Sequence, residues 1–157
     1  MAHESTIENI INALMDYFEN NIDTYLAAIT EEKGDNITLD SFREYVRDDS
    51  DPYLRQVYPS AQFYSTNIID RYLTTGMNEV IITANILMTI KTGSNIVVKM
   101  DRYCEALRQM INDDESLNNG AHKLGPEITI NQFPTVENKK TALVTLDIIK
   151  DVFHKQS

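Results

Sequence analysis

The segment Glu79–Lys91 alternates between apolar and polar side chains more regularly than any other part of the chain. One face would carry Val80, Ile82, Ala84, Ile86, Met88 and Ile90. The other face would include Thr83, Asn85 and Thr89. Because successive side chains of a strand point to opposite faces, this period of two predicts a β-strand with one buried face. The chain is therefore predicted to contain a sheet.

Two further segments carry apolar residues at the three- and four-residue spacing of an amphipathic helix. The first begins at Ser5-Thr6-Ile7-Glu8, which has the form of a capping box, and its apolar stripe continues to Ile29. The second follows Gly93-Ser94-Asn95, which is predicted to end the strand and cap the helix. Because acids are unfavourable at a helix C-terminus, Asp113-Asp114-Glu115 predicts that this helix stops at or before Asn112.

The stretch between the first helix and the long strand is less regular. Asp40 is predicted to cap a short helix, and the acidic run that ends at Pro52 is predicted to form an exposed loop. The apolar residues of that short helix would be Phe42, Tyr45 and Val46. The segment Tyr53–Tyr72 predicts irregular structure followed by a strand, because Pro59 interrupts its aromatic and β-branched pattern. Thr74-Thr75-Gly76 is predicted to be a turn.

Two alternating segments, Glu127–Phe133 and Thr141–Phe153, complete the pattern and are predicted to pair as a hairpin. The predicted fold is α+β, with a mixed, mainly antiparallel four-stranded sheet flanked by the long N-terminal helix and the second helix. Its order is helix, short helix, strand pair, helix, strand pair. A length of 157 residues predicts a single domain over residues 1–157.

The net charge of −10 is concentrated in the N-terminal third. Residues 1–51 hold 13 Asp and Glu against 3 Lys and Arg, whereas the rest of the chain holds 11 of each. The first helix carries Glu4, Glu8, Asp16, Glu19 and Asp23 opposite its apolar stripe. An acidic surface repels phosphate backbones, so sequence-specific nucleic-acid binding is not expected. No apolar run approaches the length of a membrane span and no signal peptide is readable, so we expect a cytoplasmic protein without a membrane partner.

No pattern in the sequence predicts catalysis, a metal site or a cofactor. His3, His122 and His154 have no ligand at metal-binding spacing, and the five glycines form no phosphate-binding loop. Cys104 has no obvious partner base and is interpreted as a small buried hydrophobic residue. The acidic clusters lack the spacing of an EF-hand, so they are interpreted as solvated loops.

The segment Asn78–Ala121 resembles the tail-terminator and neck proteins of tailed bacteriophages. The resemblance lies in the strand NEVIITANILMTIK, the helix VVKMDRYCEALRQMI with its central Tyr103, and the acidic turn DDESLNNGA. It extends loosely over Tyr53–Phe153 through the order of the strands. The acidic N-terminal helix and residues 31–51 have no counterpart in the resemblance.

The resemblance implies a ring-forming structural subunit, typically a hexamer, that works without a cofactor or catalysis. Such a ring sits at the end of the tail tube, where it ends tube polymerisation and joins the tail to the head. The implied partners are further copies of the chain, the tail tube and the head-completion proteins. The implied location is the virion, in its tail or neck, after synthesis in the host cytoplasm.

Two other classes of function stay open beside a ring subunit: a small acidic adaptor that captures a protein partner, and an enzyme that unites carboxylates from separate loops. For a ring, the predicted contact surfaces are strand edges and two loops, residues 48–59 and 134–140. The predicted interface residues are Asp48, Asp49, Asp51, Tyr53, Tyr58, Lys139 and Lys140. The two lysines would face the acidic N-terminal third of a neighbour.

Overall fold

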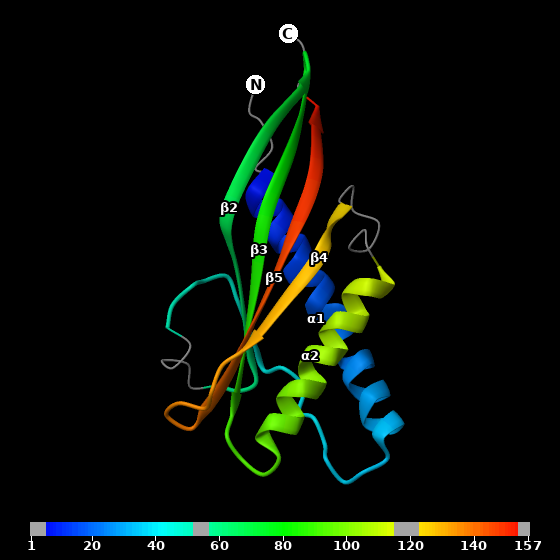
Figure 1. Ribbon diagram of the computed structural model, residues 1–157, viewed down its shortest axis with the longest axis vertical. Helices are drawn as coiled ribbons and strands as arrows, with labels where there is room; N and C mark the ends of the chain where they lie inside the picture. The colour runs from blue at the N-terminus through cyan, green and yellow to red at the C-terminus, as the bar shows by residue number, and fades with distance from the viewer. Residues whose placement is uncertain (1–5, 52–56, 115–122, 154–157) are drawn as a thin grey trace.

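The computed structural model describes residues 6–51, 57–114 and 123–153 and shows two helices against one sheet (Figure 1). The helices are α1 (Thr6–Lys33) and α2 (Ile96–Asp113). The strands are β1 (Glu44–Val46), β2 (Ser60–Thr74), β3 (Met77–Lys91), β4 (Lys123–Gln132) and β5 (Lys139–Phe153). The predicted α+β class is confirmed, as are the two long helices and the two pairs of long strands.

The sheet has five strands in the order β1-β2-β3-β5-β4, so the predicted four-stranded sheet is one strand short. All neighbours pair antiparallel except β1, which runs parallel to β2 at the edge. Strand β5 lies between β3 and β4, with Ile82 opposite Ile148 and Ile128 opposite Leu146. The predicted hairpin of the last two strands is therefore confirmed, and it joins the rest of the sheet through β5.

The extra strand replaces the short helix that was predicted after Asp40, and that prediction is wrong. Residues 44–46 are extended and pair with 60–62 of β2, and the amide of Arg43 donates to the carbonyl of Pro59 at 2.9 Å. A helix of two turns is marginal by itself, whereas the edge of an existing sheet supplies backbone partners at once. Pairing with β2 therefore decides the conformation of this segment.

The core lies between the helices and one face of the sheet, and Phe18 of α1 is at its centre. Phe18 is fully buried, and its ring meets those of Phe42, Phe63 and Tyr45 edge-on at 5.0, 5.3 and 5.9 Å between centroids. Strand β3 contributes the alternating apolar residues that its sequence predicted, all of them buried. One helix, the extended β1 segment and β2 thus meet at a single aromatic cluster.

Polar contacts also tie α2 to α1 and to the segment that follows α1. The hydroxyl of Tyr17 donates to the carbonyl of Met110 at 2.7 Å, and Arg102 donates to both carboxylate oxygens of Asp35 at 2.9 and 2.6 Å. The hydroxyl of Tyr25 donates to Asp113 at 2.7 Å. This hydrogen bond gives the carboxylate of Asp113 a partner at the C-terminus of α2. The helix runs to Asp113, one residue beyond the limit of Asn112 that the sequence predicted.

The start of α2 differs from the predicted cap. Asn95 occupies the N-cap position, but its backbone is left-handed with φ 61°, and its side chain makes no capping hydrogen bond. Its carbonyl accepts from the amide of Lys99 at 2.8 Å, so the first turn is closed by backbone alone. Asn tolerates this backbone conformation better than most side chains, and here that tolerance replaces side-chain capping.

Candidate functional site

One face of the sheet has no helix of the described chain packed on it. The inner face contacts both helices: Phe63 of β2 meets Phe18 of α1, and Gln132 of β4 donates to Asp101 of α2 at 2.7 Å. We call the opposite side the open face. Its residues in the long strands include Ile69, Arg71, Glu79, Ile81, Thr83, Asn85, Leu87, Leu143, Thr145, Asp147, Ile149, Asp151 and Phe153.

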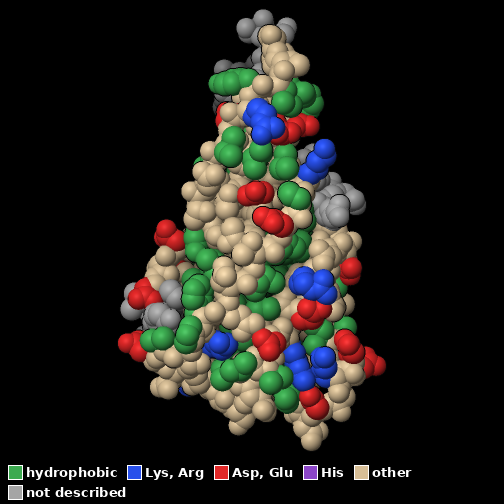
Figure 2. Space-filling view, viewed as in Figure 1, with side chains coloured by type: hydrophobic (Ala, Val, Ile, Leu, Met, Phe, Trp, Pro, Cys, Tyr) green, Lys and Arg blue, Asp and Glu red, His purple; other side chains and the backbone are tan. Residues whose placement is uncertain are grey.

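The upper part of the open face is apolar. Ile81 of β3 pairs with Ile69 of β2 on one side and with Ile149 of β5 on the other, so three isoleucines lie side by side across the sheet. We call them the isoleucine row. Ile69 is 46% exposed, and Phe153, further along β5, is 74% exposed. Figure 2 shows hydrophobic side chains over these upper strand ends.

The middle of the open face is polar and internally bonded. Thr83 donates to Asp147 at 2.8 Å, and Thr145 donates to Asn85 at 3.1 Å. Asn85 in turn donates to Thr66 of β2 at 3.0 Å. These bonds join three strands and hold their side chains in place beside the isoleucine row, and Asn85 at their centre is only 3% exposed.

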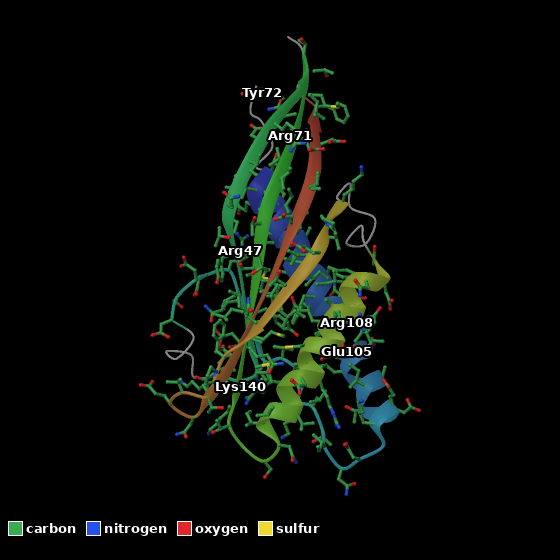
Figure 3. The ribbon with its side chains drawn as sticks, in the orientation of Figure 1. Arg47, Arg71, Tyr72, Glu105, Arg108 and Lys140 are labelled. Atoms are coloured by element: carbon green, nitrogen blue, oxygen red, sulfur yellow. The ribbon has the colours of Figure 1, made fainter. Side chains whose placement is uncertain are left out.

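The upper ends of β2, β3 and β5 extend past the start of α1 as an arm (Figure 1). On the helix side of this arm Ile68 is 46% exposed and Tyr72 is 81% exposed. Figure 3 shows Tyr72 near the upper end beside Arg71, which pairs with Glu79 at 3.3 Å. Large apolar side chains are therefore exposed on both faces of the arm, which is typical of a surface that meets another protein.

The outer edge of β2 along this arm is also unoccupied by any described strand. Strand β1 pairs only with residues 60–62, and β2 continues from there to Thr74. An exposed edge of this length presents a row of backbone donors and acceptors to which another chain can add a strand.

The predicted loop 48–59 contains one carboxylate with a structural role. Asp48 accepts hydrogen bonds from the amide of Ser50 at 2.9 Å and from the side chain of Gln62 at 3.2 Å, so it fastens the loop to β2. Asp49 and Asp51 are exposed. Tyr53 lies outside the described residues.

The structure brings the second half of this loop to the other predicted loop. The ammonium of Lys139 lies 5.4 Å from the centroid of the Tyr58 ring, a cation–π contact between residues that are far apart in sequence. Lys140, in contrast, is only 7% exposed, and its ammonium donates to the carbonyl of Phe133 at 2.8 Å. Figure 3 shows Lys140 at the lower end of the sheet. Lys140 therefore stabilises the connection 133–140 from within the fold and is not a surface residue.

A pocket of about 290 Å³ opens at the same lower end and was not foreseen from the sequence. Its cations are Arg43 before β1, Lys91 at the end of β3 and Lys99 in the first turn of α2, and we call this group the basic pocket. Tyr103 and Asp40 line it as well. These residues come from three separate segments, so no local spacing could have indicated the pocket.

Cys104 is unsuited to act as a nucleophile. The thiol is 6% exposed, and burial raises its pKa to about 12, with a further contribution from Asp101 and an opposing one from Lys140. Because the thiolate is the nucleophilic form, this cysteine is protonated at neutral pH. Its position agrees with the prediction of a small buried residue.

The acids of the described chain do not gather into a metal-binding group. Within residues 6–51, 57–114 and 123–153, no three His, Cys, Asp or Glu side chains are grouped so that they could hold a metal ion. Glu105 has its pKa lowered to about 2, mainly by the hydrogen bonds from Arg108, which lies one turn away. Figure 3 shows this pair on α2.

No described helix combines the length and the apolar character that crossing a bilayer requires. A comparison with known proteins adds no relative: no family model matches the sequence, and no curated protein matches it.

Proposed function

We propose that the protein is a non-enzymatic structural subunit that assembles with further copies of itself into a ring. In line with the resemblance of Asn78–Ala121, the ring would end the tube of a phage tail and join the tail to the head. A hexamer in the virion, bound to tube and head-completion proteins, is the arrangement that this resemblance implies.

The observation that carries the proposal is the open face with its arm. A two-layer fold normally buries the apolar face of its sheet, and here, on the other face, the described residues leave Ile69 and Phe153 exposed and Ile81 and Ile149 only half-buried. Single exposed apolar residues are ordinary, but a row across three strands beside an exposed strand edge supports a protein contact.

A closed ring also requires two different surfaces on each subunit, because every copy meets one neighbour with one surface and the next neighbour with another. The arm with Ile69 and Phe153 lies at one end of the sheet, and the basic pocket with Lys91 and Lys99 lies at the other, so the two surfaces can contact different neighbours.

The test is the mass and shape of the purified protein over a range of concentrations. We expect native mass spectrometry to give one multiple of the chain mass and negative-stain electron microscopy to show rings. When added to a polymerising tail-tube protein from the same genome, the ring should cap the tube and fix its length. A stable monomer that neither forms rings nor binds the tube would contradict the proposal, and capture of a single basic protein by that monomer would favour the adaptor class.

A further inference from the structure

We infer that the basic pocket receives carboxylates from the first helix of a second copy of the chain. This inference rests on the proposed self-assembly and names the two surfaces that would meet. It concerns the lower end of the sheet and is independent of the arm.

The cations of the basic pocket are not neutralised within the described chain. Arg71, Arg102 and Arg108 each form an ion pair with a carboxylate, at 3.3, 2.6 and 2.6 Å. Arg43, Lys91 and Lys99 form no ion pair with another described residue, although all of them line one pocket.

The pocket contains one carboxylate of its own, from Asp40, against these three cations. Lys99 is half-buried and Tyr103 forms an apolar wall. Arg43 and Lys91 are exposed, so desolvation contributes little, but cations that converge at one concave site attract an anion more strongly than the same charges spread over a surface. The site is therefore suited to oxyanions.

Carboxylates in a matching array lie on α1. Glu8, Asp16, Glu19 and Asp23 are exposed, and their spacing of about 100° per residue places them along one side of the helix. We call them the acidic stripe. None forms an ion pair with another described residue. Their field reaches the sheet edge, since the pKa of Tyr45 is raised to about 12 by burial and, secondarily, by Asp23 and Glu19.

The stripe and the pocket do not meet within one chain, because no residue of α1 lines the pocket. A second copy can bring them together. Copies with a net charge of −10 repel one another, so they associate most readily where a contact sets uncompensated cations of one copy against uncompensated acids of the next. The basic pocket and the acidic stripe satisfy this condition and form a head-to-tail contact, as a ring requires.

Charge reversal on each side tests the contact by sedimentation equilibrium of the full chain at low and moderate salt. Lys91→Glu with Lys99→Glu reverses the charge of the pocket, and Asp16→Lys with Glu19→Lys reverses two of the four charges of the stripe. We expect each double variant to self-associate about tenfold or more weakly than wild type at low salt. The chain with all four changes should regain part of the association, because the two lysines in its stripe meet the two glutamates in the pocket of the next copy.

Matched controls separate this contact from net charge and from folding. Lys33→Glu with Lys150→Glu makes the same charge change away from the pocket and from the isoleucine row, and Glu31→Lys with Glu32→Lys makes it on α1 outside the stripe. The dissociation constants of both controls should differ less from that of wild type than those of the test variants do. Thermal unfolding in the monomeric range checks that every variant is folded.

The outcomes distinguish this inference from the proposed function. A wild type that stays monomeric refutes both. A wild type that forms rings while the reversed variants match their controls overturns only the pairing of pocket and stripe. Failure of the fourfold variant to regain association overturns it as well. Inorganic phosphate that shifts the NMR signals of Lys91 and Lys99 but leaves association unchanged would show a site for a small anion instead.

Discussion

Removing the exposed apolar side chains of the open face should weaken self-association more than it weakens the fold. The variant is Ile69→Ser combined with Phe153→Ser. Ile69 is 46% exposed and Phe153 is 74% exposed, so a large part of each side chain is not buried within one subunit. If a neighbouring copy covers them, the free energy of burying their exposed surface is gained only on assembly.

The size of the effect follows from the area that remains to be buried. Complete burial of a large apolar side chain stabilises by about 1.5–3 kcal/mol. The exposed fractions of Ile69 and Phe153 then correspond to about 0.7–1.4 and 1.1–2.2 kcal/mol if a partner covers them fully. Their sum weakens the dissociation constant of one contact by about 20- to 400-fold. The fractions already buried within one subunit correspond in the same way to about 0.8–1.6 kcal/mol for Ile69 and 0.4–0.8 kcal/mol for Phe153, so the free energy of unfolding should fall by about these amounts.

The assay is sedimentation equilibrium for the dissociation constant and urea unfolding for stability. Ile68→Ser is the matched control, because Ile68 directly precedes Ile69 in the same strand, is also 46% exposed and lies on the opposite face. Ile69→Ser alone should weaken association about 3- to 10-fold, and Ile68→Ser should do so less. Equal effects of the two single variants, or no effect of either on a wild type that assembles, would refute the assignment of the contact to the open face.

Three other predictions concern the fold that presents these surfaces. Phe18→Ala should lower the free energy of unfolding by about 3–5 kcal/mol in urea titrations, because the fully buried ring fills the aromatic cluster; a loss of 1 kcal/mol or less would contradict its central place. Asp35→Asn should destabilise the protein at neutral pH, because hydrogen bonds from Arg102 lower the pKa of Asp35 from 3.8 to about 2. Because the pKa of Asp35 is lower in the folded chain, its ionised form stabilises the protein at pH values above the unfolded-state pKa, and this stabilisation is lost as the pH falls through the folded-state pKa. The unfolding midpoints of wild type and variant should therefore converge between about pH 4 and 2. A constant difference between the midpoints would argue against the ion pair. Lys140→Glu should destabilise much more than Lys139→Glu in thermal unfolding, because it sets a buried carboxylate against a carbonyl oxygen, and equal shifts would contradict the burial of Lys140.

The burial of Lys140 also changes the test of the predicted interface. Reversing Lys139 and Lys140 together would disturb the fold through Lys140, so a loss of association could not be assigned to a surface contact. Lys91 and Lys99 replace them as the informative positions.

The sequence by itself determined the elements that depend on local periodicity. The alternation of Glu79–Lys91 and the helical stripe that follows Asn95 fix which side of each element is apolar, and in a stable fold that side must be buried. Lys140 was predicted to lie in the loop before the strand Thr141–Phe153; the structure begins β5 at Lys139, which puts Lys140 on the buried face of Ala142 and Val144. The isoleucine row could be predicted only in part, because parity gives the face of Ile81 but not its neighbours.

The tertiary structure alone decided what depends on strand order. Residues 44–46 are extended because the edge of β2 offers hydrogen bonds that no nearby sequence reveals. Lys139 meets Tyr58 because β5 lies between β3 and β4, and the basic pocket exists because Arg43, Lys91 and Lys99 reach the same end of the sheet. Local patterns record the environment of each side chain, whereas contacts between distant segments depend on which pairing buries the most surface over the whole chain.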